Sequence, residues 1–168
     1  MSVIRMAMTI EEYNNSVDKF ADGLYRFALK SLGNIEEAED AVQDAFEKLW
    51  IKREEASFEK VKSYMYTIVY HSIIDRSRKI KRFHDFQELP FDDVQHTTDN
   101  FDLKRQLERA LQLLPTYQRN VVLLRDYEGY TYQEIGEITN LTTQQVKVYI
   151  FRARKSLRTY LNCLEQHI

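Results

Sequence analysis

The chain of 168 residues has only 4 Gly and 2 Pro, and 43% of its residues are hydrophobic and 30% charged. So few turn residues argue against β-sandwiches, barrels and Rossmann-type folds, and the composition excludes a disordered chain. No apolar run approaches the roughly 20 residues that a membrane-spanning helix needs. The single Cys163 and the lack of a secretory signal favour the cytoplasm. We therefore expect an all-α, cytoplasmic protein without membrane insertion.

The net charge of −2 conceals a strong alternation of charge along the chain. Residues 1–21 carry −1, residues 22–59 carry −5 and residues 60–82 carry +6. Residues 83–102 then carry −6, and residues 103–168 carry +4. Such an alternation is typical of a protein that presents different faces to different partners.

The first half of the chain predicts three helices. Thr9 and Glu12 form a capping-box pattern at the start of the first, and Gly33 suits the left-handed position that ends it. Apolar residues at helical spacing predict a second helix over residues 35–50. The third helix is expected from about residue 60 to residue 81.

The segment 83–102 interrupts the helical pattern. It contains Pro90, six acidic residues and neither Lys nor Arg, and it shows no sustained periodicity. A connection of this length is unusual inside one compact domain. We therefore expect a flexible acidic linker that joins two small helical domains, residues 1–82 and 103–168.

The second half predicts a helix-turn-helix. Helices are expected over residues 103–114 and 116–127, followed by a short helix through about residue 139. Asn140 can adopt the left-handed turn conformation, and a final long helix then runs from about residue 143 to residue 161. A short helix, a tight turn and a longer basic helix make up the DNA-binding motif, although helical hairpins also occur in proteins that bind no DNA.

The final helix has the composition of a recognition helix. Between residues 143 and 160 it carries five basic residues and no acidic one. Gln, Lys and Arg side chains can read base edges in the major groove and hold phosphates. We favour DNA binding over the alternative of a solvated cationic helix end. The candidate contacts are Thr143, Gln144, Lys147, Val148, Phe151, Arg152 and Arg154.

The basic stretch 60–82 combines seven cations with Tyr64, Tyr66 and Tyr70. Cations beside aromatic rings can grip single-stranded nucleic acid, because phosphates meet the cations and bases stack on the rings. The alternative is that these tyrosines are core or interface residues, which is slightly more common for tyrosine taken alone.

An acidic stripe lies on the predicted second helix. Asp40, Gln43, Asp44 and Glu47 recur at one-turn spacing. The stripe fits a docking face for a basic partner, a catalytic or metal-binding row, or merely solvated acids, and composition does not decide among them. No Gly-rich phosphate loop is present and the four His do not cluster, so we expect no enzyme activity, no cofactor and no metal.

Three segments resemble the extracytoplasmic-function sigma factors of bacterial RNA polymerase, members of the sigma-70 family. The segments, in order, are NIEEAEDAVQDAFEKLW, SYMYTIVYHSIIDRSRK and LPTYQRNVVLLRDYEGYTYQEIGEITNLTTQQVKVYIFRARKSL. The resemblance implies two helical domains, regions 2 and 4, joined by a flexible linker and without catalysis of their own.

The resemblance also implies partners and contacts. The stripe Asp40, Gln43, Asp44 and Glu47 would dock on the clamp helices of the largest polymerase subunit, and the β-subunit flap would be a second contact. The third helix would read the −10 element as single strand through Tyr64, Tyr66, Tyr70, His71, Arg76, Arg78 and Lys79, and the recognition helix would read the −35 element as duplex. The acidic linker would thread a cationic channel of the polymerase. An anti-sigma factor is an expected partner; a small-molecule substrate is not.

Two other interpretations are compatible with the sequence. An ordinary helix-turn-helix regulator would bind duplex DNA as a dimer that spans two half-sites. A sigma mimic would be a helical interaction protein that sequesters a regulator. Neither alternative uses both the acidic stripe and the basic aromatic helix for promoter recognition.

Overall fold

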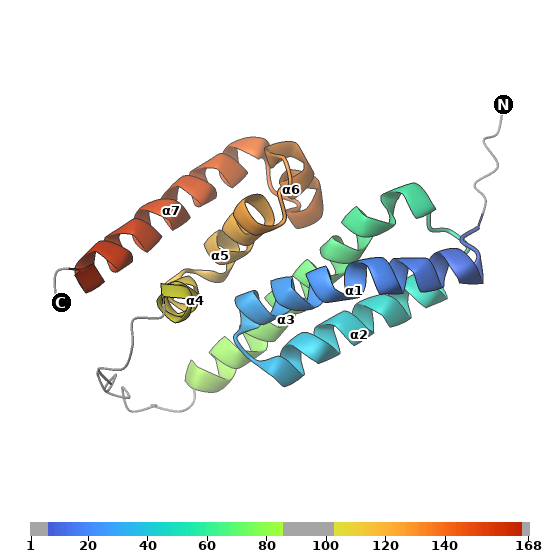
Figure 1. Ribbon diagram of the computed structural model, residues 1–168, viewed down its shortest axis with the longest axis horizontal. Coiled ribbons are helices and arrows are strands. Elements are labelled where there is room, and N and C mark those ends of the chain that lie inside the picture. The colour runs from blue at the N-terminus through green and yellow to red at the C-terminus, as the bar shows by residue number, and fades with distance from the viewer. Residues whose placement is uncertain (1–6, 86–102, 166–168) are drawn as a thin grey trace.

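The structure is a computed structural model that describes residues 7–85 and 103–165, all of whose regular elements are helices (Figure 1). The described chain forms two helical units. None of the described helices has an apolar stretch long enough to cross a bilayer. Much of the predicted linker lies outside the described residues.

The N-terminal unit consists of α1 (Ile10–Leu32), α2 (Ile35–Ile51), the 3₁₀ turn η1 (Phe58–Lys60) and α3 (Val61–Asp85). The predicted capping box at Thr9 is present, and Gly33 ends α1 with a φ of 68°. α2 packs closely against α1 and α3 because its buried residues Ala38, Ala41 and Ala45 are small. Leu24 and Phe27 of α1 complete this core.

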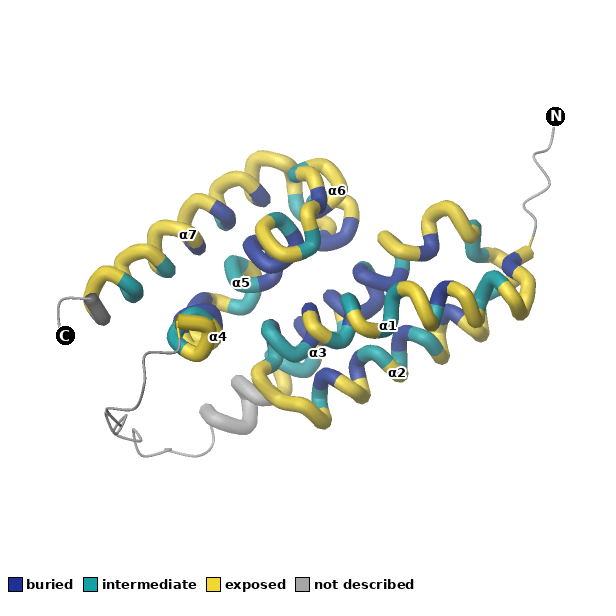
Figure 2. The backbone as a smooth tube through the Cα atoms, in the orientation of Figure 1, coloured by how far each residue is buried: buried dark blue, intermediate teal, exposed yellow. Residues whose placement is uncertain are grey.

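The C-terminal unit consists of α4 (Leu103–Leu113), α5 (Thr116–Val122), the π turn η2 (Leu123–Tyr127), α6 (Tyr132–Thr139) and α7 (Thr143–Glu165). α7 packs on α4, α5 and α6. Its residues Val146, Ile150 and Ala153 are buried and recur at about one-turn spacing, as expected for the core-facing side of a helix. Figure 2 shows the opposite side of α7 exposed along its length.

Three predicted boundaries differ from the structure. The third helix continues to Asp85 rather than residue 81, because no helix-ending residue precedes Pro90. The helix predicted over 116–127 changes its hydrogen bonding at Leu123, whose carbonyl accepts from the backbone N–H of Glu128 at 3.1 Å. The last helix runs to Glu165 rather than residue 161.

The two units lie against each other, as Figure 1 shows for α3 beside α5 and α6. A second line of contact joins α1 to α4, α5 and η2. The sequence separates the units by a long connection and contains no pattern that predicts this packing.

Candidate nucleic-acid interface

The helix-turn-helix is held by reciprocal side-chain caps. Thr131 accepts from the N–H of Glu134 at 3.2 Å, and the Glu134 carboxylate accepts from the N–H of Thr131 at 2.7 Å. Thr142 and Gln145 repeat this exchange at the start of α7. Between the two helices Asn140 adopts the left-handed conformation with a φ of 59°, as predicted. These caps fix the angle at which α7 leaves the turn.

The recognition helix presents the predicted face to solvent. Phe151 is 68% exposed and Val148 is 39% exposed, which is unusual for large apolar side chains on a folded domain. Thr143, Gln144, Lys147 and Arg152 are exposed on the same helix. An exposed helix with polar, cationic and apolar groups has the donors for base edges and the methyl and ring groups that contact thymine methyls.

Arg154 differs from the other predicted contacts of α7. Its guanidinium forms a two-point pair with Asp126, with distances of 2.6 Å from Nη2 to Oδ1 and 3.1 Å from Nε to Oδ2. The hydrogen bond to Asp126 raises the pKa of Arg154 and outweighs its partial burial. In this structure Arg154 ties α7 to η2.

The predicted single-strand contacts of α3 fall into separate environments. His71, Arg78 and Lys79 are exposed, and Tyr64 is half-buried. Tyr66 and Tyr70 are each only 2% exposed, so in this structure they are interface residues. They lie on a different face of α3 from the buried Met65, and this second apolar face packs against the C-terminal unit.

Arg76 joins the predicted DNA face to the predicted docking stripe. Its Nη2 lies 3.0 Å from Oδ2 of Asp44, and its Nη1 pairs with Glu37. Burial lowers the pKa of Arg76, but the hydrogen bond and charge of Glu37, together with Asp44, outweigh burial and raise it. Asp44 therefore stabilises the packing of α2 on α3, whereas Asp40, Gln43 and Glu47 of the same stripe are exposed.

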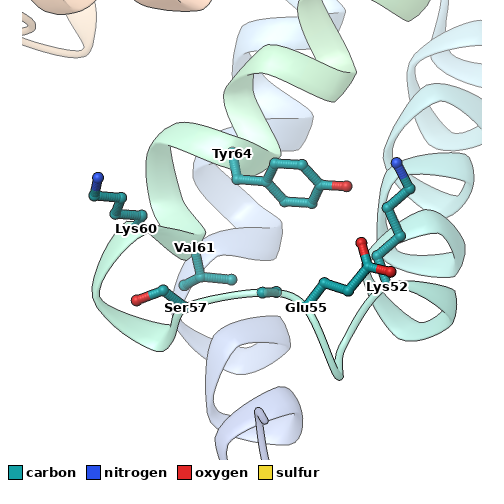
Figure 3. A pocket seen from close by; sticks show the side chains of 7 residues that line it. Lys52, Glu55, Ser57, Lys60, Val61 and Tyr64 are labelled. Atoms are coloured by element: carbon teal, nitrogen blue, oxygen red, sulfur yellow. The ribbon is translucent and has the colours of Figure 1, made fainter. Parts of the chain in front are cut away.

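A pocket of about 260 Å³ lies where α2 turns into α3 (Figure 3). Tyr64 and Val61 of α3 form one side, and the connection contributes Glu55, Ala56 and Ser57. Lys52 and Lys60 stand at the two ends of that connection. The pocket combines an aromatic ring, a hydroxyl, two lysines and the Glu55 carboxylate. An aromatic ring beside cations is the combination that can hold a base and its phosphates.

Sequence reasoning identified Tyr64 but missed Lys52, Ser57 and Lys60 as neighbours of one pocket. The sequence signal that could have indicated this pocket is the pair Lys52 and Lys60, one at each end of the short connection between α2 and α3. Only the turn η1, which brings the connection back over Tyr64, places them together. Among the described residues no group of three His, Cys, Asp or Glu side chains is arranged to hold a metal ion.

A capped helix-turn-helix beside a basic aromatic helix defines a helical DNA-binding protein. Two family models match this chain: Sigma-70 region 2 over residues 17–83 and Sigma-70 region 4 over residues 104–157. The first match covers most of the N-terminal unit, and the second covers most of the C-terminal unit.

Curated relatives match along most of their length. The chain is 30% identical to the RNA polymerase sigma factor SigV of Bacillus subtilis, covering 82% of this chain and 83% of the relative. It is 31% identical to the ECF sigma factor SigM of Mycobacterium tuberculosis, with 84% and 72% covered. Identity to the ECF sigma factor SigW of Bacillus subtilis is 27%, with 92% and 91% covered.

Two solved structures share the fold at 22% identity. The sigma factor RpoE of Bartonella quintana, solved with the anti-sigma factor NepR, superposes with a TM-score of 0.74 over 91% of this chain and 98% of that chain. CnrH, solved with the cytosolic domain of CnrY, gives a TM-score of 0.66 over 90% and 88%. The chain belongs to the extracytoplasmic-function sigma factors of the sigma-70 family.

Proposed function

We propose that this sigma factor directs promoter-specific initiation through three separate surfaces: the acidic face of α2, the pocket and basic edge of α3, and the exposed face of α7. The observation that carries the proposal is the exposure of Phe151 and Val148 on a capped, basic second helix of a helix-turn-helix. That helix is available for the major groove of a duplex −35 element.

The −10 element is read by the pocket and the exposed cations of α3. An unstacked base enters beside Tyr64, whose ring offers a stacking surface, while Lys52 and Lys60 hold the flanking phosphates. Unstacking costs a few kcal/mol per base, and stacking on an aromatic ring returns about 1–3 kcal/mol. Capture in this pocket thus supports strand opening without a nucleotide cofactor.

Core polymerase binds the exposed carboxylates of α2. Asp40, Gln43 and Glu47 form an exposed polar stripe with a carboxylate at each end, which suits the clamp helices of the largest subunit. The exposed apolar residues of α4, Leu103 and Leu113, suit the β-subunit flap. Because the two structural neighbours are complexes with an anti-sigma factor or with a second protein's cytosolic domain, we also propose an anti-sigma partner.

Run-off transcription with purified core polymerase and a library of genomic fragments tests the proposal. The wild-type chain should initiate at specific sites, and Asp40→Lys should lower the yield at least about tenfold by placing a cation on the docking stripe. Asp18→Lys makes the same charge change on the exposed side of α1 and should initiate normally. Asp44→Arg is a poorer test because it also breaks the ion pair with Arg76.

Equal initiation by Asp40→Lys and Asp18→Lys would contradict the docking surface. Specific duplex binding without polymerase, and no initiation with it, would favour a helix-turn-helix regulator. Inhibition of transcription without initiation would favour a sigma mimic.

A further inference from the structure

The connection between α2 and α3 forms one wall of the pocket that contains Tyr64. Lys52 and Glu55 line that wall, and Figure 3 shows the ring of Tyr64 extending toward their side of the pocket. Arg53 lies in the same turn but is not among the residues that line the pocket. Its contacts go instead to Trp50 in the last turn of α2 and to Met8, just before α1.

The side chain of Arg53 stacks on the end of α2. Its guanidinium carbon lies 4.2 Å from the ring centre of Trp50, and its Nη1 donates to the Trp50 carbonyl at 2.9 Å. The Trp50 ring meets the ring of Tyr13 in α1 edge-on, at a centroid distance of 5.0 Å. The Tyr13 hydroxyl in turn donates to the carbonyl of Phe46 at 3.2 Å. A series of side-chain contacts therefore links Arg53 to both α1 and α2.

The backbone of Arg53 is joined to the segment that enters α1. Its carbonyl accepts from the N–H of Met8 at 2.9 Å, and Met8 is only 4% exposed. The capping box of Thr9 and Glu12 follows directly and fixes the direction in which this segment enters the helix. The connection is therefore anchored through the backbone of Arg53 as well as through its side chain.

Building on the proposed function, we propose that Arg53 is a positioning residue for single-strand recognition: it holds the connection so that Lys52 and Glu55 stand across the pocket from Tyr64. A loop that is ordered before its ligand arrives loses less conformational entropy on binding, so the affinity is higher. The effect of Arg53 on the strand passes through the connection. Direct binding of a phosphate by the Arg53 cation is the alternative that the experiment separates.

Two pairs of variants test the anchor without changing the net charge. Arg53→Lys keeps the cation but loses the planar guanidinium that stacks on Trp50 and donates to its carbonyl. Arg26→Lys is its matched control, because Arg26 lies exposed on α1 and pairs with Asp22 at 3.2 Å. Met8→Pro removes the N–H that donates to the Arg53 carbonyl, whereas Met8→Leu keeps that N–H and an apolar side chain.

The test measures binding of the full chain to a fluorescent thymidine homopolymer of about a dozen nucleotides, chosen because ring stacking tolerates any base. Arg53→Lys should bind it about fivefold more weakly than Arg26→Lys, and Met8→Pro about fivefold more weakly than Met8→Leu. The slope of log Kd against log salt concentration should not change, because no cation is lost. Affinity for a mixed-sequence duplex should be equal in all four variants, since the exposed face of α7 is unaltered.

A double-mutant cycle with Tyr64 shows whether Arg53 acts through the pocket. Tyr64→Ala alone should weaken binding of the single strand. Adding Arg53→Lys to Tyr64→Ala should then change the affinity by less than about twofold, because the residue that the connection faces is already missing. Fully additive losses would mean that Arg53 contacts the strand independently of the pocket and would overturn the proposal. Equal single-strand affinity of Arg53→Lys and Arg26→Lys would also overturn it.

The same measurements distinguish this proposal from the proposed function. Weak binding by Tyr64→Ala together with normal binding by Arg53→Lys would overturn the positioning role and leave the pocket as the binding site for the strand. Normal binding by Tyr64→Ala would refute the pocket and the positioning role together. If circular dichroism shows that Arg53→Lys does not fold, the Met8 pair decides, and equal single-strand affinity of Met8→Pro and Met8→Leu would then overturn the proposal.

Discussion

At the scale of single residues, close packing explains the glycine in the helix-turn-helix. A Cβ at Gly136 would lie 2.8 Å from the carbonyl oxygen of Leu141, a backbone atom that the turn holds in place. The N–H of Leu141 also donates to the Gly136 carbonyl at 3.2 Å, and this hydrogen bond holds the two sides of the turn together. The absence of a side chain is therefore a condition for the tightness of this turn.

Gly136→Ala should destabilise the protein even though alanine is the better helix former. The propensity gain of about 1 kcal/mol is outweighed by the contact with Leu141, and we expect a net loss of about 1–2 kcal/mol. For a chain of this size the melting temperature should fall by about 2–8 °C. Ser156→Ala, on the exposed side of α7, serves as the control because it raises helix propensity without bringing a new atom against the backbone. An unchanged or raised melting temperature for Gly136→Ala would show that the turn can relax.

Burial separates residues that sequence alone treats alike. Tyr64 lines a pocket, whereas Tyr66 and Tyr70 are buried against the other unit. Their four-residue spacing puts Tyr66 and Tyr70 on one side of the predicted helix. It did not predict which side meets solvent, because the covering residues come from more than fifty positions further along the chain.

At the scale of elements, one side chain caps two helices from different units. Arg119 donates to the carbonyls of Leu111, Gln112 and Leu114 at distances of 2.8 to 3.0 Å, at the end of α4. It also donates to the carbonyl of Ser31 in the last turn of α1. Both helix ends carry unsatisfied carbonyls and the negative end of the helix dipole, so a cation is favoured there. Burial nevertheless lowers the pKa of Arg119.

Arg119→Lys should be strongly destabilising despite keeping the charge. A lysine ammonium has only three N–H donors, all on one nitrogen. It therefore cannot donate to the four carbonyls that surround the planar guanidinium of Arg119. We expect a loss of about 2 kcal/mol, or a fall of about 4–8 °C in melting temperature. Arg105→Lys on the exposed face of α4 is the matched control and should change little. Equal melting temperatures for the two variants would mean that a lysine ammonium stabilises these carbonyls as well as the guanidinium does.

The π turn η2 positions the residues of the C-terminal unit that contact α3. Its wider hydrogen bonding, in which the N–H of Glu128 reaches the carbonyl of Leu123 at 3.1 Å, is followed by Gly129 in the left-handed conformation, with a φ of 75°. Glu128 and Tyr130, which contact Tyr66, follow directly. Helical periodicity predicted a continuous helix here because a π turn shares the same residue types.

At the scale of the whole molecule, the interface should respond to alkaline pH. Burial raises the pKa of Tyr66, with further contributions from Glu128, and burial likewise raises the pKa of Tyr70 and of Tyr130. Because each folded pKa lies above the ordinary value of about 10, the folded state binds protons that the unfolded state loses. This contribution to stability is complete below about pH 10 and declines as the pH rises further.

A pH titration followed by tyrosinate absorbance and circular dichroism should therefore show part of the tyrosinate absorbance appearing only together with the loss of tertiary structure. That part belongs to Tyr66, Tyr70 and Tyr130. Tyr66→Phe should reduce it. Ionisation of every tyrosine in one step near pH 10, without loss of structure, would contradict the burial of these rings in solution.

The sequence by itself determined the all-helical fold, the cap at Thr9, the helix-turn-helix, the solvent-facing side of α7 and the family. Each of these follows from local spacing, from caps within four residues or from ordered motifs. Only the tertiary structure decided that Arg76 neutralises Asp44, that Lys52 and Lys60 share a pocket with Tyr64, and that the second apolar face of α3 is covered. These contacts join residues far apart in the chain, so they depend on how complete helices pack. The opposite charges of the blocks 22–59 and 60–82 accordingly meet in part within one folded unit rather than only at separate partners.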